Sequence, residues 1–131
     1  MIQNGESTTV EFKENVGGND AWIKTVCAFS NGDGGYIFFG VKDDGSITGI
    51  EQVDTDKIAS KLRDWIEPFP YYEFQKIEIN GKMIYYLQVG RGTQKPYVVK
   101  NHGVIIRAQA TTRQASRNEL LQLFEQGRGD H

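Results

Sequence analysis

Glu6, Glu11 and Lys13 lie within one short segment near the start of the chain, and Asp43 follows a long apolar run. Carboxylate oxygens are the ligands that hard cations such as Mg²⁺ and Mn²⁺ prefer in proteins. A lysine beside such a cation can neutralise the charge of a phosphate. These residue types in this arrangement therefore predict metal-assisted chemistry on a phosphorylated substrate.

The segment that carries Glu11 and Lys13 has the alternation of a β-strand. Val10 and Phe12 alternate with these two charged residues, and side chains two apart on a strand point to the same face. We expect Val10 and Phe12 to lie in the core, with Glu11 and Lys13 side by side on an open face. The alternative is that the charges only blunt the edge of a sheet, where charged residues are common.

Helical and strand patterns alternate along the chain and define the elements that must position these residues. Asp20 is a good N-cap for the first helix, and the apolar run 36–41 predicts a strand buried on both faces. Asn80-Gly81 between two alternating runs is a strong hairpin signal. In order, we expect a strand over 10–13, a loop over 15–19, a helix over 20–29, a turn over 31–35, strands over 36–41 and 46–50, a helix from Asp54 or Thr55 to Ile66, strands over 73–79, 83–89, 98–99 and 104–107, and a helix after 111–114 that carries Leu120, Leu121, Leu123 and Phe124 and ends at Gly127.

This order of elements predicts an α+β fold with a mixed or antiparallel sheet and about three helices, lying mainly on one face. The 131 residues suit one domain, 1–131, with a frayed tail over about residues 126–131. No apolar run is long enough to span a bilayer, and the N-terminus lacks the basic and apolar segments of a signal peptide. Cys27 is the only cysteine, so no intramolecular disulfide can form, and we expect a cytoplasmic protein.

Charge is distributed unevenly along the chain, although the net charge is only -2. Residues 1–70 hold 6 Lys and Arg against 12 Asp and Glu, whereas residues 71–131 hold 9 against 5. An acidic cluster for a metal and a basic surface for phosphates would produce this asymmetry, and so would ordinary solvated faces. The candidate phosphate contacts are Arg91, Lys95, Lys100, Arg107 and Arg113.

Six aromatic residues lie near this basic half and are candidates for stacking on unpaired bases. Alternation within strands predicts that about half of them are core residues, and the core is favoured for each one except Tyr97. Tyr97 is the exception because it follows Pro96 at the end of a basic loop. The six are Tyr71, Tyr72, Phe74, Tyr85, Tyr86 and Tyr97.

The glycine-rich run over 32–35 does not predict a nucleotide-binding loop. Phosphate loops run from a strand through glycines into a helix, so that the helix N-terminus meets the phosphate. Here the order is helix, glycines, strand, which predicts a helix end and a turn. A nucleotide-binding regulator is therefore the least favoured function.

Several strings along the chain together resemble the Schlafen-type AlbA-like domain, and they cover nearly its whole length. The most specific is A-F-S-N-x-x-G-G-Y-x-x-x-G-V over residues 28–41. The matching segments are Glu6-Ser7, 10–13, 26–31, 34–41, 43–45, 47–49, Pro96-Tyr97, Arg107, 112–115 and Glu119-Leu120.

The resemblance implies a Schlafen AlbA-like fold and, for some animal members, metal-dependent endoribonuclease activity on tRNA and rRNA. Carried over by motif, the metal ligands and catalytic residues would be Glu6, Glu11 and Asp43, with Lys13 adjacent and Mg²⁺ or Mn²⁺ as the cofactor. The implied partner is nucleic acid, with tRNA-like RNA favoured over DNA, and no membrane is involved. Nuclease members pair two lobes around RNA, so this single lobe would have to form a homodimer.

Two functions remain open. In the first, the chain is a metal-dependent endoribonuclease that acts on structured RNA. In the second, as for many prokaryotic members, it is a non-catalytic DNA- or RNA-binding regulatory module whose acidic residues are structural. Geometry separates the two, because three carboxylates within about 4–5 Å of one point favour a metal. Carboxylates that are splayed apart or tied to an arginine favour the module.

Overall fold

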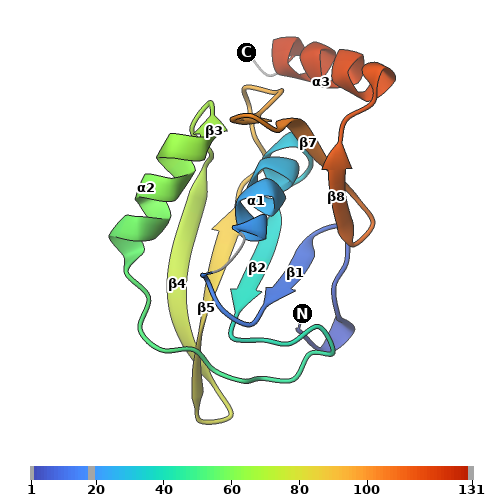
Figure 1. Ribbon diagram of the computed structural model, residues 1–131. Coiled ribbons are helices and arrows are strands. Elements are labelled where there is room, and N and C mark those ends of the chain that lie inside the picture. Colours follow the sequence, from blue (N-terminus) through green and yellow to red (C-terminus); the bar gives the residue numbers. More distant parts are fainter. Residues whose placement is uncertain (1, 18–19, 130–131) are drawn as a thin grey trace.

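Within residues 2–17 and 20–129, which the computed structural model describes, two four-stranded sheets pack against a central helix, α1 (Ala21–Asn31) (Figure 1). The α+β class and the mixed sheet with three α-helices are confirmed. No helix in these ranges combines the length and hydrophobicity needed to cross a bilayer. The other elements are η1 (Ile2–Asn4), β1 (Val10–Lys13), β2 (Gly35–Phe39), α2 (Thr55–Trp65), β3 (Ile66–Glu67), β4 (Tyr72–Ile79), β5 (Lys82–Val89), β6 (Val98–Val99), β7 (Gly103–Ala108), β8 (Thr111–Gln114) and α3 (Arg117–Gly129).

The first sheet has the strand order β1-β2-β5-β4, so β1 is an edge strand and β2 is interior. β1 pairs parallel to β2 with Glu11 opposite Ile37, and the other pairs are antiparallel. The β4–β5 hairpin turns at Asn80 and Gly81, which have φ angles of 53° and 77°. Two successive positive φ angles are those of a tight type I′ turn, so the expected hairpin is confirmed.

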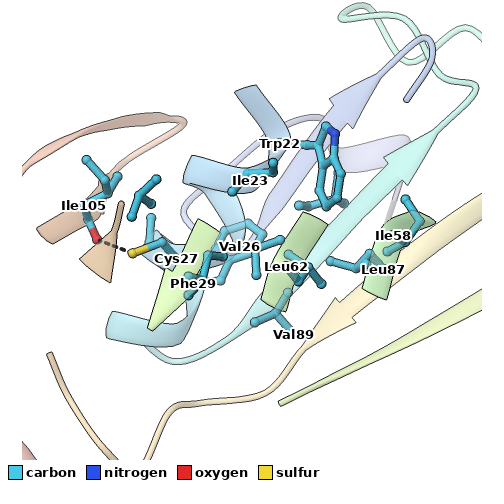
Figure 2. Packing of buried hydrophobic residues seen from close by; sticks show 14 of the residues in the cluster. Trp22, Ile23, Val26, Cys27, Phe29, Ile58, Leu62, Leu87, Val89 and Ile105 are labelled. Atoms are coloured by element: carbon cyan, nitrogen blue, oxygen red, sulfur yellow. Dashed lines mark hydrogen bonds between the residues drawn. The ribbon is translucent and has the colours of Figure 1, made fainter. Parts of the chain in front are cut away.

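The second sheet has the order β3-β6-β7-β8 and is antiparallel throughout. α1 lies between the two sheets, and 9 of its residues are buried. Figure 2 shows α1 side chains, including Trp22, Val26 and Phe29, packed among residues from the sheets and from α2. A helix that is buried on nearly every side can keep polar residues only where they find partners.

Asn31 at the end of α1 has such partners in the second sheet. Its Nδ2 donates hydrogen bonds to the carbonyl oxygens of Tyr97 (2.9 Å) and Ile105 (2.8 Å). Its Oδ1 accepts a hydrogen bond from the backbone N–H of Tyr97 at 2.6 Å. Both ends of the buried amide are thus satisfied, and the helix is fixed to β7 and to the residue before β6.

The opposite face of the first sheet carries a second, smaller core. Val10 and Phe12 of β1 lie there with Phe38 of β2, and Ile2 and Ile47 pack over them from outside the sheet. This arrangement confirms that Val10 and Phe12 are core residues and that β2 is buried on both faces.

The partner strand expected over residues 46–50 does not form. Within residues 46–50 the structure has only one bridge, between Ile47 and Val41. Gly45 and Gly49 have positive φ angles of 89° and 79°, which extended strands do not use. The N–H groups of Thr48 and Gly49 both donate to the carbonyl oxygen of Gly40, so the chain curls instead of extending.

Asp20 precedes α1 as expected, but its side chain does not cap the helix. The residue has a left-handed conformation with φ of 55°, and no hydrogen bond joins its side chain to the helix N-terminus. Its Oδ1 instead accepts a hydrogen bond from Lys61 Nζ of α2 at 2.8 Å. Of the loop expected over 15–19, residues 18 and 19 lie outside the described residues.

The C-terminal part differs from the expectation in two ways. Residues 111–114, expected as an approach to the last helix, form β8, and α3 continues through Gly127 to Gly129. The tail expected to be frayed is therefore helical up to residue 129, and residues 130–131 lie outside the described residues. Gly127 is buried against the backbone of Lys95. A Cβ atom at this position would overlap the carbonyl oxygen of Lys95, so the helix can pass this point only with glycine.

The two outer helices bury their apolar stripes only in part. In α2, Ile58 and Leu62 are buried, but Trp65 is exposed, contrary to the helical spacing. In α3, Leu123 is buried, whereas Leu121 and Phe124 are exposed. The exposed side chains mark surfaces that this chain does not cover by itself.

We predict that Asn31→Asp lowers the free energy of unfolding by about 3–5 kcal/mol. The substituted side chain has the same shape, but two carbonyl oxygens lose their donor and face a buried carboxylate. Urea denaturation followed by circular dichroism measures the change. Asn118→Ala, in the exposed first turn of α3, is the control and should shift stability by less than about 0.5 kcal/mol. Equal effects of the two substitutions would contradict the role given to Asn31.

Candidate functional site

Glu6 and Glu11 meet at the free edge of the first sheet. The N–H of Ser7 donates to the carbonyl oxygen of Val10 at 2.9 Å, which turns the segment before β1 back over the strand. Glu6 Oε2 then accepts a hydrogen bond from the backbone N–H of Phe12 at 3.0 Å. The Glu6 side chain therefore satisfies a donor of the edge strand, and it also hydrogen-bonds to Glu11.

Glu11 points from β1 toward α1 and is 8% exposed, so it does not stand on an open face as expected. The Thr25 hydroxyl of α1 donates to its Oε2 at 3.2 Å. Lys13 Nζ lies 3.5 Å from the same oxygen, and Arg107 Nη2 lies 3.4 Å from Oε1. A carboxylate with three such partners is a well-compensated buried charge.

The two carboxyl groups differ in pKa for physical reasons. Burial raises the pKa of Glu6 from 4.5 to about 7, and the hydrogen bond to Glu11 and the charges of Glu11 and Asp43 add to the rise, while the Phe12 N–H opposes it. Burial would also raise the pKa of Glu11, but the Glu6 hydrogen bond and the charges of Arg107 and Lys13 hold it below its usual value. Near neutral pH Glu6 is therefore partly protonated, whereas Glu11 is ionised.

Asp43 is the expected carboxylate that the structure does not bring into contact with the pair. It is exposed in the turn after β2 and acts on Glu6 through its charge. Across residues 2–17 and 20–129, no three His, Cys, Asp or Glu side chains are grouped as a metal site requires. Two carboxylates nevertheless fit a Mg²⁺ or Mn²⁺ ion, because Mg²⁺ commonly takes one or two protein carboxylates plus water and phosphate oxygens.

Arg107, expected to contact phosphate, is part of the internal support of this site. Its side chain is 4% exposed. Nε and Nη2 donate to the carbonyl oxygen of Ser7 at 3.2 and 2.8 Å, and Nη2 donates to that of Val10 at 3.0 Å. The guanidinium carbon also lies 5.3 Å from the centre of the Phe29 ring. Arg107 thereby joins β7 to β1 and holds Glu11 from the side opposite Lys13.

The other basic candidates do not form one surface with Arg107. Lys95 is buried and its Nζ donates to Gln126 Oε1 at 3.0 Å. Arg113 donates two hydrogen bonds to Glu119, at 2.7 and 2.9 Å. Arg91 and Lys100 are exposed. Tyr97, expected at the surface, is buried because its backbone bonds to Asn31.

A groove of about 530 Å³ lies where β1 and β2 begin, and Ser7, Thr9, Gly34, Tyr36 and Arg91 are among its lining residues. Glu6 and Glu11 do not line it, although their chain neighbours Ser7 and Val10 do. Neither this groove nor the role of Thr25 was predicted from the sequence. A local pattern could have indicated Thr25, because this polar residue lies among the apolar positions 22, 23, 26 and 29 of a helix and would need a buried hydrogen-bond partner there.

A family model for Schlafen, AlbA_2 matches residues 6–116. The chain belongs to this family. The match contains the Glu6–Glu11 pair, Asp43 and Arg107. The expected resemblance is thus confirmed, and it extends over the whole of both sheets.

Three relatives of this Schlafen AlbA_2 chain are informative. It is 33% identical over 91 residues to the uncharacterized ATP-binding protein UU034 of Ureaplasma parvum serovar 3, but it spans only 26% of that protein. The N-terminal domain of a RecG-related protein of Nitrosomonas europaea, whose name links it to ATP-dependent DNA helicases, superimposes with a TM-score of 0.59 at 25% identity, covering 85% of this chain and 84% of the domain. The DIP2311 protein of Corynebacterium diphtheriae has a TM-score of 0.70 at 21% identity, over 88% of this chain and 26% of its own, and shows the fold alone.

We predict that Glu6→Gln raises the free energy of unfolding at pH 8 but not at pH 5. Because the folded-state pKa of Glu6 lies near 7 and above its unfolded value, its stabilising contribution is present at low pH and is lost as pH rises through about 7. Glutamine resembles protonated Glu6, since it can accept from Phe12 and donate to Glu11. We expect a gain on the order of 1 kcal/mol at pH 8, reduced by solvent screening. Urea midpoints at both pH values measure it, with Glu125→Gln on the exposed face of α3 as the control. A gain that is equal at both pH values would contradict the raised pKa of Glu6.

Proposed function

We propose that this domain binds nucleic acid and cleaves its phosphodiester backbone with Mg²⁺ or Mn²⁺ at the Glu6–Glu11 pair, with structured, tRNA-like RNA as the substrate rather than DNA. The observation that carries the proposal is the pair itself: Glu6 and Glu11 lie together at the edge of the sheet, Lys13 Nζ lies 3.5 Å from Glu11 Oε2, and the pKa values of the two carboxyl groups are shifted in opposite directions. Paired carboxylates with separated pKa values are typical of reactive sites. The preference for RNA rests on the resemblance to nuclease members of the family.

Each residue has a distinct part in this proposal. Glu6 and Glu11 would hold the ion, and Asp43, which already acts on Glu6 electrostatically, would be the third ligand. A bound ion supplies Lewis acidity and lowers the pKa of a coordinated water. Lys13 Nζ, at the exposed side of Glu11, is placed to neutralise charge on the scissile phosphate. Arg107 and Thr25 are positioning residues, because they contact Glu11 and not the substrate.

A second candidate function is a non-catalytic nucleic-acid-binding module that uses the groove of about 530 Å³ at the start of β1 and β2. Two observations favour it: Glu11 is already bonded to Arg107 and Thr25, as expected of a structural carboxylate, and no three metal-ligating side chains are grouped within residues 2–17 and 20–129. The name of the Nitrosomonas europaea relative is compatible with either function. Nucleotide binding, suggested by the name of the Ureaplasma relative, has less support because the chain spans only a quarter of that protein.

The proposal includes a cytoplasmic location and a homodimer. The only cysteine, Cys27, is buried, and burial raises its thiol pKa to about 12, so it is protected from oxidation.

A second copy would supply the other half of a clamp around RNA. Sedimentation velocity in the presence of tRNA should give the mass of two copies of the chain plus one tRNA. A complex of one copy with one tRNA would reject the clamp.

We predict that the chain cuts end-labelled tRNA in Mn²⁺ or Mg²⁺ and not in EDTA. Glu11→Gln should lower the cleavage rate at least about a hundredfold, the scale of losing one preorganised charge in an active site. The glutamine keeps the shape that Thr25 contacts, and Arg107 keeps its hydrogen bonds to the carbonyl oxygens of Ser7 and Val10, so circular dichroism should show the native fold with a lower unfolding midpoint. Glu14→Gln, an exposed neighbour just beyond β1, is the matched control and should cleave normally.

A DNA strand of the same sequence distinguishes an RNA-specific nuclease from a general one, because only RNA should be cut. RNA that is bound but uncut, equally by wild type and Glu11→Gln and equally in EDTA, would identify the binding module. Cleavage that persists undiminished in Glu11→Gln would exclude the carboxylate pair as the reaction centre.

A further inference from the structure

Three exposed aromatic side chains follow one another where α2 leads into β4. Trp65 ends α2 and is 37% exposed, and Phe69 and Tyr71, in the link between β3 and β4, are 54% and 75% exposed. We call these three residues the aromatic row. Large apolar side chains are normally buried, so three exposed rings within seven residues form an unusual surface.

Grooves lie between these rings and beside them, and each groove contains a basic side chain. Phe69 and Tyr71 line a groove of about 380 Å³ together with Arg91. Trp65 and Phe69 line a second, of about 470 Å³, with Arg63 and Lys100. The far side of Trp65 borders a third, of about 170 Å³, with Lys24 and His102. Rings and cations therefore alternate along one continuous surface.

The rings are held in place by short local contacts. Phe69 lies between Pro68 and Pro70, and a proline fixes its own φ angle, so the backbone that carries the ring is stiff. The Phe69 ring leans on Tyr72 with a centroid distance of 5.9 Å. The Tyr71 ring covers Gly90, where a Cβ atom would lie 2.8 Å from it. Rings held in this way lose little conformational entropy when a ligand stacks on them.

Acidic residues are also present along this surface. Asp64 and Glu67 line the groove between Trp65 and Phe69, and Asp20 lines the groove beyond Trp65. Asp20 is already paired with Lys61 at 2.8 Å. Lys24, Arg63, Arg91 and Lys100 outnumber the acidic residues, so the surface is basic although the whole chain is acidic. This small excess of positive charge favours a ligand that is held mainly by stacking on the aromatic row, with its phosphates making secondary contacts.

We propose that the aromatic row binds unpaired bases of single-stranded nucleic acid by stacking, with Arg63, Arg91 and Lys100 contacting the phosphates between them. Every base has a π-face, so stacking combined with a cationic groove is the physical basis of binding to single strands. The inference deepens the proposed function, on which it rests for the chemistry of the ligand, and it uses none of the carboxylate residues.

Arg91 links the two surfaces. It lines the groove beside Phe69 and Tyr71, and it also lines the groove of about 530 Å³ at the start of β1 and β2. A strand anchored on the aromatic row can therefore continue past Arg91 into the 530 Å³ groove, which extends to Ser7 and Val10, the chain neighbours of Glu6 and Glu11. The substrate class that follows is RNA with an unpaired segment next to the cleaved bond.

The test uses Trp65 fluorescence in EDTA, where no metal-dependent cleavage takes place. Trp22, the other tryptophan, is 2% exposed, so quenching by an added strand reports on Trp65. A short oligouridylate should quench the signal, whereas an abasic strand of equal length and charge should bind about tenfold more weakly and leave the fluorescence unchanged. A blunt duplex, with no accessible base faces, should also fail to quench.

Substitutions separate stacking from general hydrophobicity. Phe69→Ala and Tyr71→Ala should each weaken oligouridylate binding about tenfold, and Tyr71→Phe, which keeps the ring, should not. Phe124→Ala on α3 is the matched control, because its ring is 53% exposed and lies outside the row. Tyr71→Ala keeps the test valid if Phe69→Ala fails to fold, since Tyr71 is the most exposed of the three rings.

The outcomes distinguish this inference from the nuclease proposal. Equal binding of the abasic strand, or an equal effect of Phe124→Ala, would overturn the aromatic row and leave Glu11-dependent cleavage to be judged by its own assay. Stacking on the row without any cleavage would support the row and reject only the nuclease. Absence of oligouridylate binding would overturn the row directly.

Discussion

The side-chain amide of Asn31 is the interaction on which the rest of the structure depends, because it fixes α1 to the second sheet. Six residues earlier on the same helix, Thr25 contacts Glu11 of the first sheet. Since α1 is nearly rigid over this length, the Asn31 contacts set how β7 lies relative to β1. Arg107 of β7 can reach Ser7, Val10 and Glu11 only in that arrangement.

The candidate site also solves a structural problem of the first sheet. β1 is an edge strand, and unpaired backbone groups on an edge invite pairing with other chains. Glu6 satisfies the N–H of Phe12, and Arg107 satisfies the carbonyl oxygens of Ser7 and Val10. The groups that close this edge are thus the same groups that hold the carboxylate pair. Stability and reactivity are linked here, because any change in charge at Glu6 or Glu11 alters the closure of the sheet.

The sequence predicts several features that depend on neighbours along the chain, although not the segment 46–50 or the conformation of Asp20. The Asn80-Gly81 turn, α1, β2 and the inward position of Val10 and Phe12 follow from local spacing and are found as expected. The errors at Tyr97 and Arg107 come from contacts across the chain: the backbone of Tyr97 bonds to Asn31, 66 residues away, and Arg107 bonds to Glu11, 96 residues away. No local pattern tells a buried arginine from a phosphate-binding one. Glu6 and Glu11 were predicted only in part. Their residue types and spacing indicated a site, but the burial of Glu11 and the raised pKa of Glu6 did not follow from the sequence.

The burial of α1 has a consequence for the motions of the protein. A helix packed against both sheets is released only when the whole structure opens, so its amide protons should be among the slowest to exchange with solvent. β1 is held from one side by β2 and on its free edge by side chains, and residues 41–50 are joined to the sheet by few backbone contacts. These segments can open locally while α1 stays in place. The Glu6–Glu11 pair therefore lies at the boundary between a slowly exchanging centre and a labile edge, where side chains can rearrange around a ligand without unfolding the core.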